Sequence, residues 1–247
     1  MTDTIITMKA WPEPTVANYP ALKHFWKCDE GDGLDIVCSV TGATYRSDGD
    51  MSWTANANAL TYIQGAGANS ANGLVAGALF TPVATSKHVY LAVLGPLLAA
   101  GEDTFGVAFG VSGATTRVVH LRSRVGAKTW IAGPTGTVVA ATTTPLEIAH
   151  SLAVTTSYAG TTLSANVIQN GAVTAAVDDA TATQPSTYGD AANFICMAGL
   201  ANDLVVYGIA VFEFASLPPN VAHLTHECLG LWTSGSKVLP LGLLGVA

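Results

Sequence analysis

Residues 24–33 read HFWKCDEGDG, and residues 205–214 read VVYGIAVFEF. The first stretch is aromatic and ends in a turn rich in Asp and Gly, and the second is a longer apolar run that contains one carboxylate. Short aromatic and β-branched runs bounded by turn residues are typical of buried β-strands. Each stretch therefore predicts a buried strand, one near each end of the chain.

The chain between these stretches has the pattern of an all-β protein. Short β-branched runs are punctuated by Gly, Pro, Asn and Asp, and sustained helical periodicity is rare. Asn170-Gly171 lies between the runs 163–168 and 172–177 and predicts a β-hairpin, because both central residues of a type I′ turn need positive φ. A length of 247 residues fits a single sandwich. We therefore predict one two-sheet antiparallel sandwich over residues 22–233.

One helix is predicted near the C-terminal end. Pro218 and Pro219 are placed at its beginning, where a missing amide proton costs little. Four residues then recur on one face, which we expect to lie against the sandwich: Val221, Leu224, Cys228 and Leu231.

Two arms flank the sandwich. Residues 1–21 contain several prolines without periodicity and predict an extended N-terminal arm, whereas residues 234–247 form an apolar C-terminal tail. Both arms are expected to dock on this subunit or on another, because an exposed apolar tail promotes aggregation. Their large apolar side chains are the candidate assembly contacts: Trp11, Tyr19, Leu241, Leu243 and Leu244.

The composition limits the classes of partner. The net charge of −7 disfavours nucleic acid as a direct partner, because phosphate binding needs a basic face. Charged residues make up 11% of the chain, against about 25% in an average soluble domain, which suits either a subunit buried in an assembly or an alanine-rich protein with a neutral polar surface. The apolar runs are shorter than the roughly 20 residues of a membrane helix, so no membrane partner is predicted.

The N-terminus and the cysteines indicate synthesis in a reducing cytoplasm. No basic segment leads into an apolar one at the start of the chain, so no cleaved secretory signal is predicted. The four cysteines show no Cys-x-x-Cys spacing. We therefore expect reduced, partly buried thiols rather than a zinc site or a dithiol redox site.

Three segments, in this order, resemble the concanavalin A-like, or laminin-G-like, superfamily of jelly-roll domains found in modular bacterial and bacteriophage proteins. Residues 25–33 are similar to the opening strand of that family and its Asp-Glu-Gly-x-Gly turn. Residues 147–171 are similar to its histidine-containing strand and the strand that ends in Asn-Gly, and residues 198–232 to its closing strand and trailing helix. The family often places an aspartate where this chain has Cys38. The resemblance implies a jelly roll in which residues 24–33 and 205–214 belong to the first and last strands and lie together in one sandwich. It also implies that His150 packs or hydrogen-bonds and is not catalytic.

No catalytic residue, cofactor or metal centre is predicted. Retaining sugar hydrolases need two carboxylates about 5 to 5.5 Å apart, and the chain has no Glu-x-Asp-x-x-Glu motif to supply them. The Gly-x-Ser-x-Gly elbow and the phosphate loop are also missing. Asp48 and Asp50, together with Asn56 and Asn58, would supply oxygen ligands to calcium, but we interpret these residues as turn residues.

Two functional hypotheses follow, and neither is enzymatic. Hydrolase activity is a third possibility only because the fold that the chain resembles also hosts such enzymes. The leading hypothesis is a virion structural protein of a tailed bacteriophage, located in the virion as a capsid decoration or as a tail or collar component. Its partners are other virion proteins and copies of itself. The alternative is a carbohydrate-binding module for a cell-surface polysaccharide, with Trp53 as a stacking platform and Asn56 and Asn58 as directional polar groups.

Overall fold

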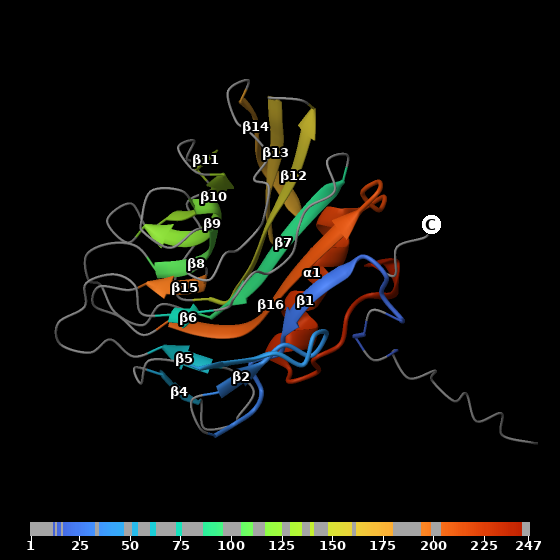
Figure 1. Cartoon of the computed structure of the whole chain (residues 1–247). Helices are drawn as coiled ribbons and strands as arrows, with labels where there is room; N and C mark the ends of the chain where they lie inside the picture. The colour runs from blue at the N-terminus through green and yellow to red at the C-terminus, as the bar shows by residue number, and fades with distance from the viewer. Residues whose placement is uncertain are drawn as a thin grey trace, which may run out of the picture.

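A computed structural model describes the protein in the following residues: 12, 14–15, 17–32, 35–46, 51–53, 60–62, 73–75, 86–95, 105–110, 117–124, 129–134, 139–140, 148–159, 162–179, 194–198 and 204–243. These residues form two antiparallel sheets, a two-stranded ribbon and one α-helix near the C-terminal end (Figure 1). The prediction of an all-β, two-sheet antiparallel sandwich with a single short C-terminal helix is confirmed for the part of the chain that is described.

The larger sheet has eight strands in the order β14-β13-β12-β7-β16-β5-β4, and β1 also pairs with β16. Its strands are β1 (Leu22–Trp26), β4 (Met51–Trp53), β5 (Leu60–Tyr62), β7 (Lys87–Leu94), β12 (His150–Ala159), β13 (Thr162–Gln169), β14 (Ala172–Asp179) and β16 (Leu204–Phe214). We call it the eight-stranded sheet.

The smaller sheet has six strands in the order β11-β10-β9-β8-β15-β6. Its strands are β6 (Gly73–Val75), β8 (Phe105–Gly110), β9 (Arg117–Arg124), β10 (Thr129–Pro134), β11 (Val139–Ala140) and β15 (Phe194–Ala198). The separate ribbon pairs β2 (Asp35–Val37) with β3 (Thr44–Arg46).

The two ends of the sandwich meet as predicted. Strand β1 pairs antiparallel with β16, and Phe25 lies opposite Ala210 and Trp26 opposite Ile209. Figure 1 shows the blue first strand running along the orange last strand. Strands from the stretches over residues 24–33 and 205–214 are therefore neighbours in one sheet.

The hairpin between β13 and β14 is also confirmed. Gln169 pairs with Ala172, and the two residues between them turn the chain. Asn170 has φ 47° and Gly171 has φ 84°, which is the left-handed conformation that both central residues of this turn require.

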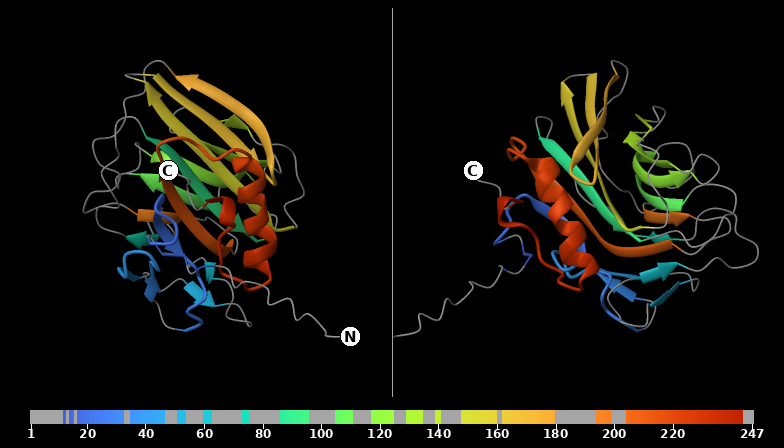
Figure 2. Two further views of the ribbon diagram at one scale, coloured as in Figure 1. Left: turned by 90° about the vertical axis from the view of Figure 1, so that its right-hand side faces the viewer. Right: turned by 180° about the vertical axis from the view of Figure 1, so that it is seen from behind.

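The eight-stranded sheet is covered on both faces, as the two views in Figure 2 show: helix α1 (Val221–Thr233) lies on one face and the six-stranded sheet on the other. We call these the helix face and the inner face. Because side chains alternate along a strand, Val89, Leu91 and Val93 of β7 join the core under the helix, while His88 and Tyr90 lie on the inner face. Strand β7 is therefore buried on both faces, because the helix covers one and the six-stranded sheet covers the other.

The helix is confirmed, but its buried stripe differs from the prediction. Thr225, Cys228 and Trp232 are buried, whereas Leu224 and Leu231 are only partly buried. The reason is the size of Trp232, whose ring fills the space above Gly208 and thereby sets which side of the helix faces the sheet. The helix begins after Asn220, which has φ 61°, and the two prolines precede that residue.

The close contact between Trp232 and Gly208 predicts that a larger residue at position 208 destabilises the protein. A Cβ atom at Gly208 would lie 2.7 Å from Cε3 of Trp232, so Gly208→Ala is expected to destabilise the protein by about 1–3 kcal/mol through overpacking. Gly230, within the helix, has open space around it, so Gly230→Ala is the matched control and is expected to stabilise by about 0.5–1 kcal/mol. Urea unfolding of both variants measures the difference, and shifts of the same sign would contradict this packing.

Candidate functional site

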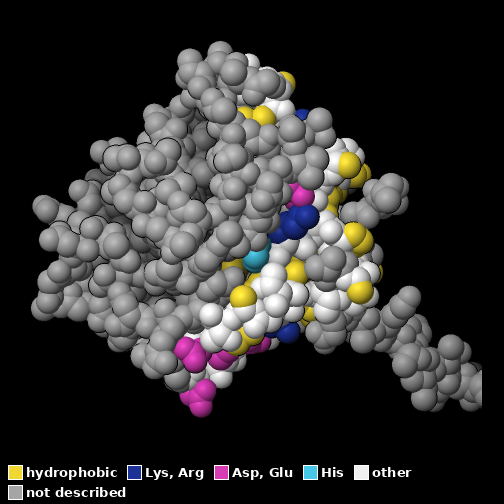
Figure 3. Space-filling model, in the orientation of Figure 1, with side chains coloured by type: hydrophobic (Ala, Val, Ile, Leu, Met, Phe, Trp, Pro, Cys, Tyr) yellow, Lys and Arg dark blue, Asp and Glu magenta, His cyan; other side chains and the backbone are white. Residues whose placement is uncertain are grey.

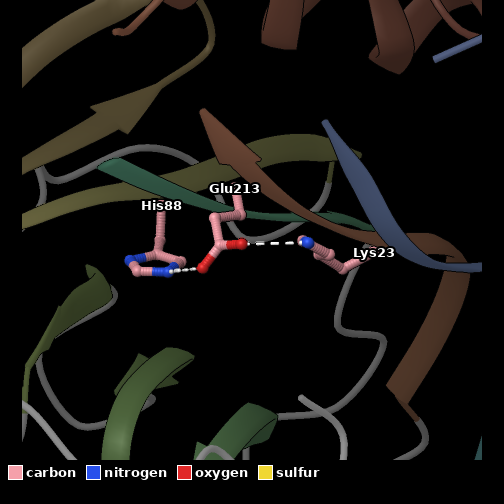
Figure 4. Close-up of polar contacts among 3 residues, drawn as sticks. All are labelled: Lys23, His88 and Glu213. Carbon is pink, nitrogen blue, oxygen red and sulfur yellow. Dashed lines mark hydrogen bonds and ion pairs between the residues drawn. The ribbon is translucent and has the colours of Figure 1, made fainter. Parts of the chain in front are cut away.

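A polar cluster of Lys23, Glu213 and His88 lies on the inner face of the eight-stranded sheet. Glu213 Oε1 is 2.9 Å from Nζ of Lys23, and its Oε2 is 3.1 Å from Nε2 of His88. Figure 4 shows the carboxylate between the two basic side chains, with the three residues coming from β16, β1 and β7. We call these three residues the inner-face cluster.

The strand order and register bring the cluster together. Strand β16 lies between β1 and β7, and Glu213 is directly opposite His88 in the register. Residues opposite each other in an antiparallel pair have Cβ atoms about 4.5–5.5 Å apart, which suits a side-chain contact. The pairing of β1 is irregular between Leu22 and His24, and Lys23 is the extra residue at that irregularity, from which its ammonium reaches Glu213.

The cluster runs from the surface into the sandwich. The Lys23 side chain is 35% exposed, that of Glu213 is 7% exposed and that of His88 is fully buried. Burial lowers the pKa of His88, an effect that the hydrogen bond with Glu213 opposes and the charge of Lys23 reinforces. His88 is therefore neutral at pH 7, and its Nε2–H donates to the carboxylate. The cluster has one positive and one negative charge.

A buried hydroxyl extends this polar surface onto the neighbouring strand. Thr156 of β12 lies directly opposite His88, and its side chain is on the same face. Thr156 is 2% exposed, and its Oγ1 has no hydrogen-bond partner among the described residues. Because an unsatisfied buried hydroxyl costs free energy, this oxygen marks a place where a ligand hydroxyl or a water would be stabilised.

Basic and acidic side chains meet on the visible surface as well. Figure 3 shows dark-blue and magenta side chains side by side on the face turned to the viewer in Figure 1, with a histidine close by. A second acidic group lies at the lower edge, over the region of β2. The exposed acidic residues next to that strand are Asp29, Asp32 and Asp35. Acidic side chains therefore dominate one edge of the described surface, while the inner-face cluster is balanced in charge.

The chemistry that this arrangement supports is hydrogen bonding to a polar ligand. In the described part of the cluster Glu213 is the one carboxylate, so the pair of carboxylates used in retaining hydrolysis is not assembled there. Among the described residues, no group of three or more histidines, cysteines or acidic residues is placed to hold a metal ion. No helix in the same part of the chain is long and apolar enough to cross a membrane.

Of the glycan-binding residues predicted from the sequence, the structure describes only the backbone of Trp53. Trp53 ends β4, an edge strand of the eight-stranded sheet, and its side chain lies outside the described residues, as do Asn56 and Asn58. Sequence reasoning missed Lys23, His88 and Glu213 as a group. One signal was present: Glu213 interrupts an apolar strand, and a carboxylate buried in such a strand needs a partner.

The assembly candidates separate into buried, exposed and undescribed residues. Tyr19 and Leu243 have no exposed surface and belong to the core of this chain, where the Tyr19 hydroxyl donates to the carbonyl of Leu239 at 2.6 Å. Leu241 is 52% exposed, so among the described members of the set it is the one that a second molecule would meet. Trp11 and Leu244 lie outside the described residues.

Two buried histidines predict that acid destabilises the fold. Burial lowers the pKa of His88 and of His150 below their usual 6.5, although the His150 ring donates through Nδ1 to the carbonyl of Ile148 at 2.6 Å. Between the lowered pKa and 6.5, the unfolded chain binds more protons than the folded one, so the free energy of unfolding is expected to fall as the pH drops below about 6.5. Urea unfolding at pH 7.5 and 5.5 measures the loss. His150→Asn is expected to reduce it, and an equal loss in that variant would contradict the assignment.

Comparison with known proteins shows the fold alone. No protein-family model matches this sequence, and the search of curated proteins gave no match. The structure is similar to that of Trypanosoma rangeli sialidase in complex with sialic acid, with a TM-score of 0.57, 11% identity, and coverage of 92% of this chain and 34% of the sialidase.

Two botulinum neurotoxin structures are similar as well. One is of neurotoxin type C, whose cell entry is described as dependent upon interaction with two ganglioside molecules. Its TM-score is 0.57 at 8% identity, and the match covers 89% of this chain and 52% of the toxin chain. For the serotype G binding domain the TM-score is 0.51 at 10% identity, covering 86% and 51%. This chain therefore spans about a third of the sialidase and about half of each toxin chain.

Proposed function

We propose that this protein is a non-enzymatic β-sandwich module that binds a carbohydrate through Lys23, His88, Glu213 and Thr156. The observation that carries the proposal is the inner-face cluster itself. A partly exposed ammonium is held by a buried carboxylate, which is held in turn by a buried neutral histidine. The hydroxyl of Thr156 lies beside them on the same face.

Sugar hydroxyls match this set of groups. Each sugar hydroxyl both donates and accepts, the Lys23 ammonium donates, and the Glu213 carboxylate accepts. Hydrogen bonds to charged groups are the stronger kind, and partial burial strengthens them further. Because Lys23 and His88 both contact Glu213, the carboxylate is already oriented before a ligand arrives, which lowers the entropic cost of binding.

The similar structures support a carbohydrate as the ligand class. One is described with sialic acid bound and another with a dependence on gangliosides. Lys23 provides the positive charge that an acidic sugar would meet, while the rest of the cluster suits neutral hydroxyls. Neutral and sialylated forms of the same oligosaccharide are therefore the pair to compare.

The test is a glycan screen of the full chain followed by calorimetric titration of the best ligand. Glu213→Gln keeps the shape of the side chain and removes its charge, and Lys23→Met removes the ammonium. Each is expected to weaken binding at least about tenfold, which corresponds to about 1.4 kcal/mol. His223→Ala is the control, because His223 is exposed on the helix at the opposite face. A screen without any ligand, or unchanged affinity in folded Glu213→Gln, would overturn the proposal.

Assembly in a virion is a second candidate function, supported by one observation. Leu241 is 52% exposed although the segment that carries it is docked through Leu239 and Leu243. Contact of this leucine with a neighbouring copy or with another virion protein would remove its apolar surface from water, which favours association. Light scattering across a concentration series is expected to show a defined oligomer that Leu241→Asp dissociates. A monomer at all concentrations would count against assembly through this segment.

A further inference from the structure

We propose that Cys38 and His24 form a nucleophilic thiol–imidazole pair that makes Cys38 the most peroxide-reactive of the cysteines whose side chains are described. This pair is separate from the inner-face cluster and does not depend on the proposed function. The three described cysteines, Cys28, Cys38 and Cys228, are all buried and outside disulfides. Among them, Cys38 is the one for which the structure records a histidine contact.

The geometry of the pair resembles that of an activated nucleophile. Cys38 forms an isolated antiparallel bridge with Trp26, next to the end of β1. Its Sγ lies 3.6 Å from Nδ1 of His24. The imidazole is stacked on the indole of Trp26, with centroids 5.1 Å apart and planes within 10°. A nucleophile in contact with a base that a third group orients is the arrangement that activates thiols.

The turn after Cys38 supplies further hydrogen bonds to the sulfur. Burial alone would raise the pKa of Cys38, but hydrogen bonds from His24, from the side chain and backbone of Thr41 and from the backbone of Phe25 lower it to about 7. The turn is closed by the Cys38 amide, which donates to the carbonyl of Ala43 at 2.9 Å. Nδ1 of His24 stabilises the thiolate by donating a hydrogen bond to Sγ, so this ring nitrogen must carry the proton.

The other two described cysteines provide the contrast. Burial raises the pKa of Cys28, and neighbouring acidic charges raise it further. Burial likewise raises the pKa of Cys228, whose thiol donates to the carbonyl of Leu224 at 3.7 Å. Because the thiolate is the reactive form, Cys38 is expected to react much faster than either at pH 7. The side chain of Cys196 lies outside the described residues.

Because Cys38 is buried, we expect a small oxidant to reach its sulfur more easily than a large one. Cys38 has no exposed surface and His24 is 3% exposed, yet Thr41 and Gly42 in the adjoining turn are exposed. A molecule as small as hydrogen peroxide needs only a local opening of this turn to reach the sulfur, whereas a bulky reagent needs a larger one.

The reaction is a two-electron oxidation of the sulfur. The thiolate attacks one peroxide oxygen, the O–O bond breaks, and hydroxide leaves and is protonated by solvent. Sulfur is oxidised to the sulfenic acid, and the peroxide is reduced by the same two electrons. Sulfenic acids condense with thiols to disulfides that further thiol reduces, so the modification is reversible.

The experiment treats the full chain with hydrogen peroxide, traps sulfenic acid with dimedone and quantifies each cysteine peptide by mass spectrometry. Cys38 is expected to be trapped at least about tenfold faster than Cys28 and Cys228, with a rate that rises with pH around a midpoint near 7. Trapping of Cys38 no faster than these internal controls, or a midpoint near the ordinary value of 9, would overturn the proposal.

Two substitutions test the roles of the partners. His24→Asn and Thr41→Val are each expected to move the midpoint upward and to slow trapping at pH 7, whereas Thr41→Ser keeps the hydroxyl and is expected to retain the native rate. Thr41 is exposed, so its variants fold even if the buried His24 variant does not. An unchanged midpoint in folded Thr41→Val would show that the turn does not stabilise the thiolate and would overturn the assigned geometry.

Discussion

Removal of residues 237–247 is expected to reduce the free energy of unfolding by most of its value, so that the shortened chain is largely unfolded at 25 °C. Leu239 and Leu243 are completely buried in the core under helix α1. Loss of a buried leucine side chain typically costs about 2–5 kcal/mol. Two such losses approach the roughly 5–15 kcal/mol that stabilises a typical domain.

Polar contacts add to this loss. The carbonyl of Leu239 accepts from the Tyr19 hydroxyl at 2.6 Å, and the carbonyl of Val238 accepts from Nε1 of Trp232 at 2.8 Å. Without the tail, both buried donors lose their acceptor, at about 1–3 kcal/mol each where water does not replace it. Lys237, whose ammonium donates to the carbonyl of Trp232 at 3.2 Å, is lost as well.

Circular dichroism and urea unfolding measure the effect of this truncation. A shorter truncation that removes only residues 244–247 is the control, because every tail contact described above stays in place. The control is expected to unfold at the urea concentration of the intact chain. Equal midpoints for the long truncation and the intact chain would mean that the tail does not contribute to the core.

Trp232→Ala is expected to cost about 3–5 kcal/mol, the range for truncating a buried large aromatic residue. The side chain is completely buried, and its ring packs against Phe25 of β1 with centroids 5.1 Å apart. It thereby joins the C-terminal helix to the first strand of the sheet. Trp232→Phe is the conservative variant and is expected to cost less, since it keeps a ring in the same place and loses the indole N–H.

A double substitution separates packing from other effects of Trp232. In the native background Gly208→Ala is expected to destabilise, because the new methyl group meets the indole ring. In the Trp232→Ala background that ring is absent, so the same glycine substitution is expected to cost little. Urea unfolding of the four proteins gives the coupling free energy, and additive effects would show that the two residues do not share a contact.

Strand β16 connects this core to the candidate binding site. Phe212 and Phe214 face the helix and belong to the core, whereas Glu213 between them faces the six-stranded sheet. Anchoring the two phenylalanines therefore fixes the position of the carboxylate between them. Substitutions that loosen the helix face are expected to weaken binding at the inner face without touching it.

The sequence alone determined the elements that depend on local pattern. The turn at Asn170-Gly171 follows from the positive φ that both positions need, and the helix over 221–233 follows from its apolar period. The pairing of the first and last strands was predicted from their resemblance to a known jelly roll. These features rest on neighbouring residues or on a recognised order of segments.

Only the tertiary structure decided which distant side chains meet. His88 and Glu213 are 125 residues apart, and their contact depends on strand order and on a register in which a shift of one residue would turn each to the other face. The burial of Tyr19 and Leu243, which the sequence indicated only as apolar, was likewise decided by packing. Local periodicity specifies which residues are buried in a strand, but the partner across the sheet is set by the free energy of the whole packed core.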